Sequence, residues 1–196
     1  MNSTIPTEPT TILPPLGNFH HVAFRCRDAE ETRAFYQDLL GLPLAAGLAL
    51  DEISGTDTQV RYLHLFFELG DGNFVAFFDA PDTATEAHFK RRSGFNRHIA
   101  IETDSLAALA VYQARLNAAG VKCEGPLDHG FVMSIYFFDP NGIQVEITAR
   151  TADYVHIMAA EKAKAVGELA RWTAQTRALK AGRGLKLMSA DPTHAI

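Results

Sequence analysis

The sequence predicts an α+β fold built from two copies of a βαβββ module and followed by a helical tail. A strand-like run that starts at His21 leads through an acidic turn into an amphipathic helix, and the same order recurs from His98. After each helix comes a pair of β-rich runs joined by turn residues, at 70–73 in the first copy and 139–142 in the second. The repeat indicates two modules whose strands pack into one curved mixed sheet.

The first module is expected over residues 18–82 and the second over residues 95–150. In each module a strand and a helix come first, and the paired β-runs close the unit. An additional short strand is predicted near 46–53 in the first copy and near 122–126 in the second. Each module alone is too short to bury a core well, so the two are expected to form one domain.

The residues on either side of this domain have different compositions. Residues 1–17 are rich in Pro and Thr, lack the basic and apolar segments of a signal peptide, and are predicted to be a flexible arm. Residues 151–196 are predicted to be a helical extension, with apolar residues at helical spacing and Trp172 as a docking residue. A homodimer through this tail or through a sheet edge is possible.

Charge and cysteine content restrict the partners that the chain can bind. The net charge of -5 and the pI near 5.9 provide no basic stripe for nucleic acid or for an anionic membrane. A small-molecule partner is therefore expected, and no apolar run approaches the roughly 18 residues of a membrane span. Cys26 and Cys123 are not in CxxC spacing, which favours free thiols in a reducing, cytoplasmic setting.

Strand alternation predicts a metal site. It places His21 and His98 on the faces turned away from the helices, and it places Glu146 on the corresponding inward face of the last strand. A buried glutamate needs a partner, so these residues form a candidate 2-His-1-carboxylate triad that suits Fe(II) or another divalent ion. Alternatively, Glu146 pairs with Arg25 or Arg61 in a metal-free binding module.

Three motifs resemble the vicinal oxygen chelate superfamily, which includes glyoxalase I, bleomycin-resistance proteins and extradiol dioxygenases. They are HHVAF…FYQDLLGL, RHIAIE and SIYFFDPNGIQVEIT, and together they extend over residues 18–150. The resemblance implies that two βαβββ modules curve around a metal and that His21, His98 and Glu146 are its ligands. His20 is expected to face the opposite way.

Within this superfamily, the residue at position 76 favours one subtype. Ala76 stands where the first module would place the equivalent of Glu146, so the fourth ligand of a glyoxalase I-like site is missing. The resemblance to extradiol dioxygenases implies that Tyr136 hydrogen-bonds the metal-bound substrate and that His129 acts as an acid or base. A second histidine that those enzymes carry in the first module is absent here, and His64 could replace it.

The expected function is therefore an Fe(II)-dependent extradiol-type dioxygenase that acts on a catechol-like small molecule. One alternative is a glyoxalase-type lyase or isomerase, which would use Mn(II), Ni(II), Zn(II) or Mg(II) and consume no oxygen. The other is a non-catalytic binding protein of the bleomycin-resistance kind.

Overall fold

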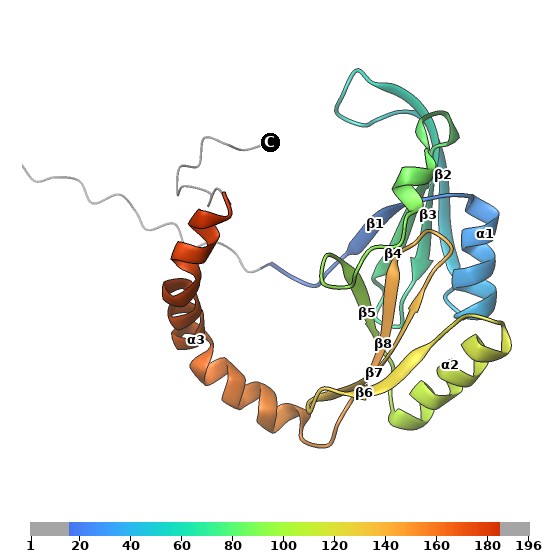
Figure 1. Ribbon diagram of the computed structural model, residues 1–196. Helices are drawn as coiled ribbons and strands as arrows, with labels where there is room; N and C mark the ends of the chain where they lie inside the picture. The colour runs from blue at the N-terminus through green and yellow to red at the C-terminus, as the bar shows by residue number, and fades with distance from the viewer. Residues whose placement is uncertain (1–15, 185–196) are drawn as a thin grey trace, which may run out of the picture. The chain divides into compact units, whose positions relative to one another are not determined.

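The computed structural model describes residues 16–184. The arm predicted over residues 1–17 lies almost wholly outside this range, as does the end of the tail. Figure 1 labels the larger elements. In chain order the elements are β1 (His21–Cys26), α1 (Ala29–Arg33), the π-helical η1 (Ala34–Leu39), β2 (Leu44–Glu52), β3 (Gln59–Glu68), β4 (Phe74–Asp79), the 3-10 helices η2 (Pro81–Thr83) and η3 (Glu86–Phe89), β5 (His98–Glu102), α2 (Leu106–Ala118), β6 (Glu124–Asp128), β7 (Val132–Phe138), β8 (Gln144–Arg150) and α3 (Tyr154–Gly182).

The strands form two four-stranded sheets with the same internal order. The first runs β1-β4-β3-β2 and the second β5-β8-β7-β6. In the first sheet β1 pairs in parallel with β4, whereas β3 is antiparallel to both β4 and β2. The shared order confirms the βαβββ repeat and the α+β class, and α3 confirms the predicted C-terminal helix. Strand β6 begins at Glu124, two residues later than expected.

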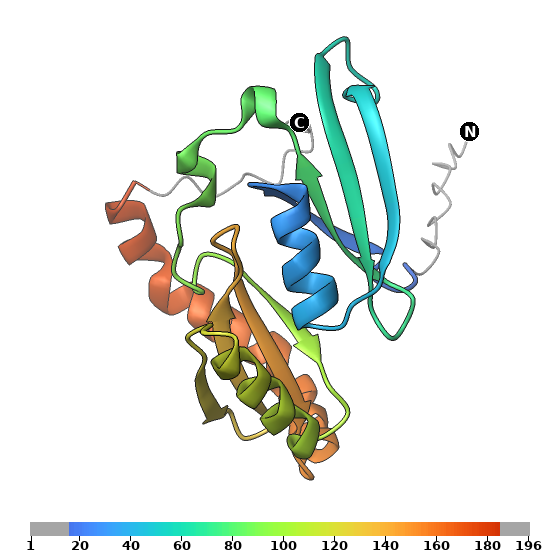
Figure 2. The same ribbon diagram turned by 90° about the vertical axis from the view of Figure 1, so that its right-hand side faces the viewer.

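Helix α1 and its continuation η1 cover one face of the first sheet (Figure 2). Tyr36 on η1 is fully buried, and its ring lies 5.4 Å from that of Phe67 and 4.8 Å from that of Phe77. Aromatic pairs at these distances add to the free energy gained by burying their area. The apolar face of the sheet therefore meets the helix, as strand alternation predicts.

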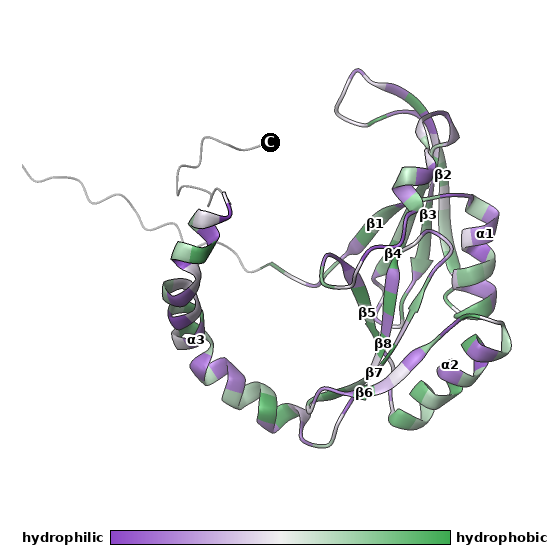
Figure 3. Ribbon diagram, viewed as in Figure 1, coloured by the Kyte–Doolittle hydropathy of each residue, from purple (hydrophilic) through white to green (hydrophobic). Residues whose placement is uncertain are grey.

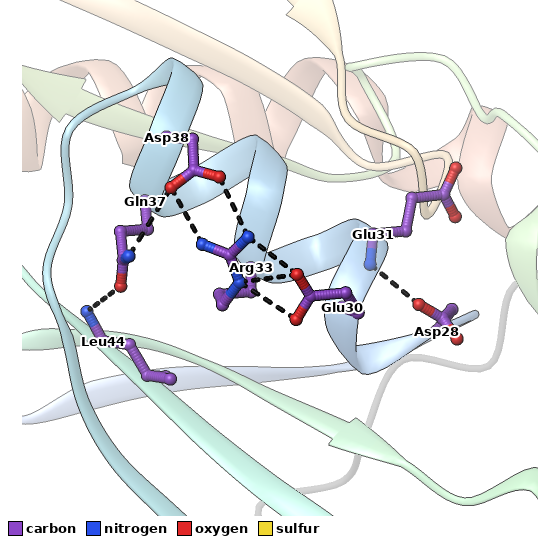
Figure 4. A network of polar contacts seen from close by, with 7 residues as sticks. All are labelled: Asp28, Glu30, Glu31, Arg33, Gln37, Asp38 and Leu44. Atoms are coloured by element: carbon purple, nitrogen blue, oxygen red, sulfur yellow. Dashed lines mark hydrogen bonds and ion pairs between the residues drawn. The ribbon is translucent and has the colours of Figure 1, made fainter.

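Charged side chains fix the start and the exposed surface of this helix (Figure 4). The Asp28 carboxylate accepts the backbone N–H of Glu31 at 2.7 Å, which is an N-cap. Arg33 donates to Glu30 and to Asp38, with shortest distances of 2.7 and 2.8 Å. These hydrogen bonds from Arg33 lower the pKa of both carboxyls. The two short helical pieces are thereby held in one continuous direction.

The turn between β7 and β8 carries a buried polar network. Asp139 accepts the Tyr36 hydroxyl at 3.1 Å and the Asn141 side-chain amide at 3.0 Å. Asn141 also donates to the Thr32 hydroxyl at 3.2 Å and accepts the backbone N–H of Arg27 at 2.8 Å. Burial raises the pKa of Asp139, and these donors partly oppose that rise. The DPNG segment thus binds residues from the first module, so its role in the fold is structural.

By contact density the chain divides into two compact units. The first holds the described residues up to Ile99, with Ala114–Lys122 and Phe137–Val145, and the second holds Ala100–Gln113, Cys123–Tyr136 and the described residues from Glu146 onward. Neither cysteine forms a disulfide. Within residues 16–184, no helix is both long and apolar enough to span a bilayer.

Candidate active site

A pocket of about 420 Å³ opens within the second unit. This volume is in the range of small-molecule sites. Three of the five predicted site residues, His129, Tyr136 and Glu146, line it together. The full lining is Ala100, Glu102, His129, Phe131, Val132, Tyr136, Glu146, Thr148, Arg150 and Tyr154. Strand alternation on β7 and β8 thus correctly predicts that Tyr136 and Glu146 share a face.

The three polar residues form a hydrogen-bonded series. The Nε2 atom of His129 lies 2.8 Å from the Tyr136 hydroxyl oxygen, and the Tyr136 side chain is hydrogen-bonded to Glu146. A phenol has one proton to donate, and an ionised carboxylate can only accept. When the Glu146 carboxylate accepts from Tyr136, the Tyr136 oxygen can in turn accept the Nε2–H of His129.

Burial affects the members of this series to different degrees. Glu146 is only 7% exposed on β8. The pKa of Tyr136 is raised, chiefly by burial and further by the charge of Glu146 and the hydrogen bond to it. Tyr136 consequently stays a neutral donor at physiological pH. A buried carboxylate held in this way is suited to bind a cation.

The turn before β7 places His129 at the rim of the pocket. The backbone N–H of His129 donates to the Val132 carbonyl at 2.9 Å, and Gly130 has a φ of +81° that favours glycine. The Gly130 N–H donates to the Asp128 side chain at 2.7 Å. Thr151, just after β8, donates its hydroxyl to the Gly130 carbonyl at 2.8 Å. The histidine is therefore exposed yet fixed.

A second polar group in the pocket, not anticipated from the sequence, joins the end of β8 to the end of β5 and the start of α3. Arg150 donates to Glu102 through Nε at 2.7 Å and through Nη2 at 2.8 Å. Its guanidinium also lies 4.4 Å from the centre of the Tyr154 ring, a cation–π distance. Alternation contained the signal, because Arg150 shares the strand parity of Glu146. What could not be foreseen was the position of Tyr154 on the helix.

One ring nitrogen of His98, the first residue of β5, is hydrogen-bonded to the backbone. Its Nδ1 lies 2.9 Å from the Gly94 carbonyl oxygen. Because a carbonyl only accepts, Nδ1 carries the proton and Nε2 carries a lone pair in the neutral ring. Metal-binding histidines commonly show this arrangement, in which the backbone orients the ring that binds the ion.

His21, the first residue of β1, contacts a second histidine. Its Nδ1 lies 2.7 Å from the Nδ1 of His20, and the ring of His20 also lies beside Phe74. The expectation that His20 would point the opposite way is therefore wrong. The strand begins at His21, so strand alternation does not apply to the residue before it.

The inward face of the first sheet is aromatic around His21. The His21 ring lies 5.6 Å from Phe66 and 6.3 Å from His64, and His64 stacks on Phe78 at 4.0 Å. Among residues 16–184, the Nε2 of His64 is buried without a hydrogen-bond partner. Burial and the neighbouring His21 lower the pKa of His64. His64 therefore lies on the inward face.

Ala76 lies on the same inward face and is fully buried. In the sheet register it pairs with Ala23 on β1 and with Phe66 on β3. No carboxylate occupies this position. Arg25 donates to the Thr83 hydroxyl at 2.8 Å, and Arg61 lies 3.9 Å from Asp82. Both arginines proposed as alternative partners of Glu146 are therefore engaged by first-module residues.

In the described part of the chain, no three His, Cys, Asp or Glu side chains lie close enough together to hold a metal ion. Of the predicted triad, His21 and His98 belong to the first unit and Glu146 belongs to the second. The pocket brings together only Glu146 and the two predicted catalytic residues. The ligand set His21, His98 and Glu146 remains a prediction from the sequence.

The comparison with protein families decides the membership of the chain. The model described as Glyoxalase/Bleomycin resistance protein/Dioxygenase superfamily matches residues 18–147. The chain belongs to this superfamily. The matched region ends before α3, so this helix is an addition to the superfamily fold.

Solved structures of other superfamily members show the same fold. A glyoxalase/dioxygenase from Nostoc punctiforme is 23% identical, with 72% of this chain and 97% of that chain covered and a TM-score of 0.54. A glyoxylase/bleomycin resistance protein/dioxygenase domain from Frankia sp. EAN1pec is 16% identical, with 70% and 100% covered and a TM-score of 0.55. A mutant of the fosfomycin resistance protein FosX from Listeria monocytogenes, complexed with Mn(II) and 1S,2S-dihydroxypropylphosphonic acid, is 21% identical, with 71% and 98% covered and a TM-score of 0.50. No curated protein matches the chain.

Proposed function

We propose that this superfamily member is a divalent-metal-dependent enzyme, an Fe(II) extradiol-type dioxygenase that acts on a catechol-like small molecule. The observation that carries the proposal is the hydrogen-bonded series of Glu146, Tyr136 and His129 inside one pocket. His21, His98 and Glu146 would hold the metal. A binding protein needs no such series between a buried carboxylate and a histidine at the pocket rim.

The chemistry of the three proposed ligands fits a first-row divalent ion. The backbone holds Nδ1 of His98, which orients Nε2 for a metal, and Tyr136 orients the buried carboxylate of Glu146. Two imidazoles and one carboxylate suit Fe(II), and also Ni(II), Zn(II) or Mn(II), whereas Mg(II) fits less well because it prefers oxygen ligands. Bound Fe(II) would supply a centre that chelates two vicinal oxygens of the substrate and passes electrons to O₂.

The residues of the chain would position the substrate and move its protons. His129 lies at the exposed rim, where it can exchange protons with water, and an imidazole can act as either an acid or a base. Tyr136 connects it to Glu146 at the bottom of the series. The apolar side chains of Phe131 and Val132 in the same pocket would contact an aromatic ring.

A second candidate is a metal-dependent lyase or isomerase, because the same proton series serves reactions that consume no oxygen. Within this alternative, Ala76 disfavours the four-ligand glyoxalase arrangement, since a fully buried alanine occupies the place of the fourth ligand. A small-molecule partner and a cytoplasmic setting are also proposed, on the basis of the net charge of -5 and the two free cysteines.

The test is metal analysis of anaerobically purified protein, combined with oxygen uptake on a panel of catechols. Glu146→Gln and His98→Ala are compared with Glu102→Gln, which removes a different carboxylate of the same pocket. We expect about one iron per chain and oxygen uptake in the wild type, loss of both in the first two variants, and retention of iron in Glu102→Gln. Metal without oxygen uptake would favour the lyase or isomerase. Absence of metal after reconstitution would contradict the ligand set.

A further inference from the structure

Helix α3 exposes six large apolar side chains to solvent. It runs from Tyr154 to Gly182, and at 1.5 Å per residue it is about 44 Å long. Val166 is 83% exposed and Trp172 is 60% exposed. Figure 3 shows apolar and polar residues mixed along the whole helix. The large exposed apolar residues of α3 are Val155, Met158, Val166, Leu169, Trp172 and Leu179.

Five of these six residues follow a heptad pattern. Val155, Met158, Leu169, Trp172 and Leu179 occupy the a and d positions of successive heptads. The remaining a and d positions are Lys162, Ala165 and Thr176. This spacing is typical of a helix that packs lengthwise against another helix. We propose that α3 forms an antiparallel pair with α3 of a second copy of this chain.

The residues at the seam favour the antiparallel direction. A parallel pair would place Lys162 against the partner's Lys162, which repels. In an antiparallel pair with Ala165 opposite the partner's Leu169, Lys162 lies opposite the partner's Trp172. That contact can bury the lysine stem and form a cation–π interaction.

The same register accounts for the remaining exposed residues. Val155 lies opposite the partner's Leu179, and Val166 lies beside the partner's Val166 at the two-fold axis. Glu168 approaches its own copy on the other side of the axis, but each Glu168 is already paired with Arg171. One register therefore buries all six exposed apolar side chains in a self-complementary interface, as a two-fold dimer requires.

Charge along the helix supports a second copy as the occupant. Residues 169–184 contain Arg171, Arg177, Lys180 and Arg183 and no acidic residue. Residues 153–168 contain three acidic and two basic residues. An antiparallel copy places the basic half of each helix along the more acidic half of the other and opposes the two helix dipoles. An anionic lipid surface would complement only the basic half of the helix, whereas an antiparallel copy complements both halves.

The test measures the mass of the full chain by sedimentation velocity across a range of concentrations. Leu169→Glu introduces a charge into the seam. Its matched control, Ala174→Glu, introduces the same charge on the same helix at an outer position of the heptad. We expect the wild type and the control to have twice the 21.5 kDa chain mass, and Leu169→Glu to have the mass of one chain. A monomeric wild type, or a dimer that survives Leu169→Glu, would overturn the proposal.

Trp172 gives a second readout, because it is the sole tryptophan of the chain. Its emission should shift to longer wavelength on dilution, in step with dissociation, and should stay at the longer wavelength in Leu169→Glu. Unchanged far-ultraviolet circular dichroism confirms that the variant is folded. Direction is tested by oxidative crosslinking: Val166→Cys should crosslink to its own copy and Val155→Cys should not. Efficient crosslinking of Val155→Cys to itself would overturn the antiparallel arrangement.

Discussion

The two sheets have the same strand order, but the side chains on their inward faces differ: one face is mainly aromatic and the other carries polar groups. On the first sheet, His64 packs among aromatic rings such as Phe66 and Phe78, and its Nε2 has no hydrogen-bond partner within residues 16–184. On the second, the buried Glu146 is held by Tyr136, which in turn bonds His129. The repeat therefore carries packed aromatic rings on the inward face of one copy and a series of hydrogen-bonded polar side chains on that of the other.

The difference can be traced to the equivalent positions 76 and 146. The side chain of a buried alanine has no polar atom that needs a hydrogen-bond partner, so aromatic rings can pack around Ala76. A buried carboxylate must be hydrogen-bonded or paired, so Glu146 requires polar neighbours. The residue at this position therefore differs in what it requires of its neighbours in each module, and the following variants test that relation.

The largest effect is expected at Glu146. Glu146→Gln keeps the shape and the Tyr136 contact but removes the negative charge, and we expect metal affinity to fall by at least about 100-fold, since even outer partners of ligands contribute roughly 10- to 100-fold. Catechol-dependent oxygen uptake should disappear with the metal. Titration with Fe(II) or Zn(II) measures the affinity. Retention of wild-type affinity would show that Glu146 is no ligand.

The reciprocal variant is Ala76→Glu, which introduces a carboxylate on the aromatic face. An uncompensated charge at this fully buried site should lower the free energy of unfolding by about 3–5 kcal/mol. Ala76→Gln has the same size without the charge and isolates the overpacking cost. Urea denaturation of both metal-free variants at one protein concentration makes the comparison. Equal stability of the two would mean that the face accommodates charge.

Tyr136→Phe should have an intermediate effect, because it breaks both links of the series without removing a proposed ligand. We expect kcat and metal affinity each to fall by about 10- to 100-fold. Metal content, steady-state oxygen uptake and titration of the ion distinguish the two losses. If metal affinity fell while kcat of the fully loaded protein stayed unchanged, Tyr136 would only orient Glu146.

His64→Leu should have a smaller effect, and with the opposite sign. Removing an unsatisfied buried nitrogen should raise the free energy of unfolding by about 1 kcal/mol. Activity should be retained, because His64 is neither a proposed metal ligand nor part of the proposed series of His129, Tyr136 and Glu146. Urea denaturation and oxygen uptake measure the two quantities. A loss of activity in a stable His64→Leu protein would assign this histidine to the reaction.

The smallest effect concerns one thiol from each module. Burial raises the pKa of Cys26 to about 12, from an ordinary value of 9.0, whereas Cys123 is partly exposed. Native protein at about pH 8 should therefore be alkylated at Cys123 first, as mass spectrometry would show.

Because the unfolded thiol ionises before the folded one, Cys26 should favour unfolding increasingly above pH 9.0. Cys26→Ala should flatten that alkaline loss of stability, and an unchanged slope would contradict the shift.

Alternation and repetition were sufficient to predict much of this molecule. They gave both modules and the shared pocket face of Tyr136 and Glu146, and helical spacing gave the C-terminal helix. They failed for His20, because parity holds only inside a strand. They also could not show that Arg150 packs on Tyr154, since that contact depends on the angle at which α3 leaves β8.

The buried network of Asp139 and Asn141 has a consequence for how such chains are recognised. The DPNG turn is the most distinctive motif of the sequence, yet its polar groups form hydrogen bonds with Tyr36, Thr32 and the backbone. A relative could lose every reactive side chain and still keep this signature for as long as it folds. The turn therefore indicates membership of the superfamily, whereas the residues around the pocket distinguish an active enzyme from an inactive relative.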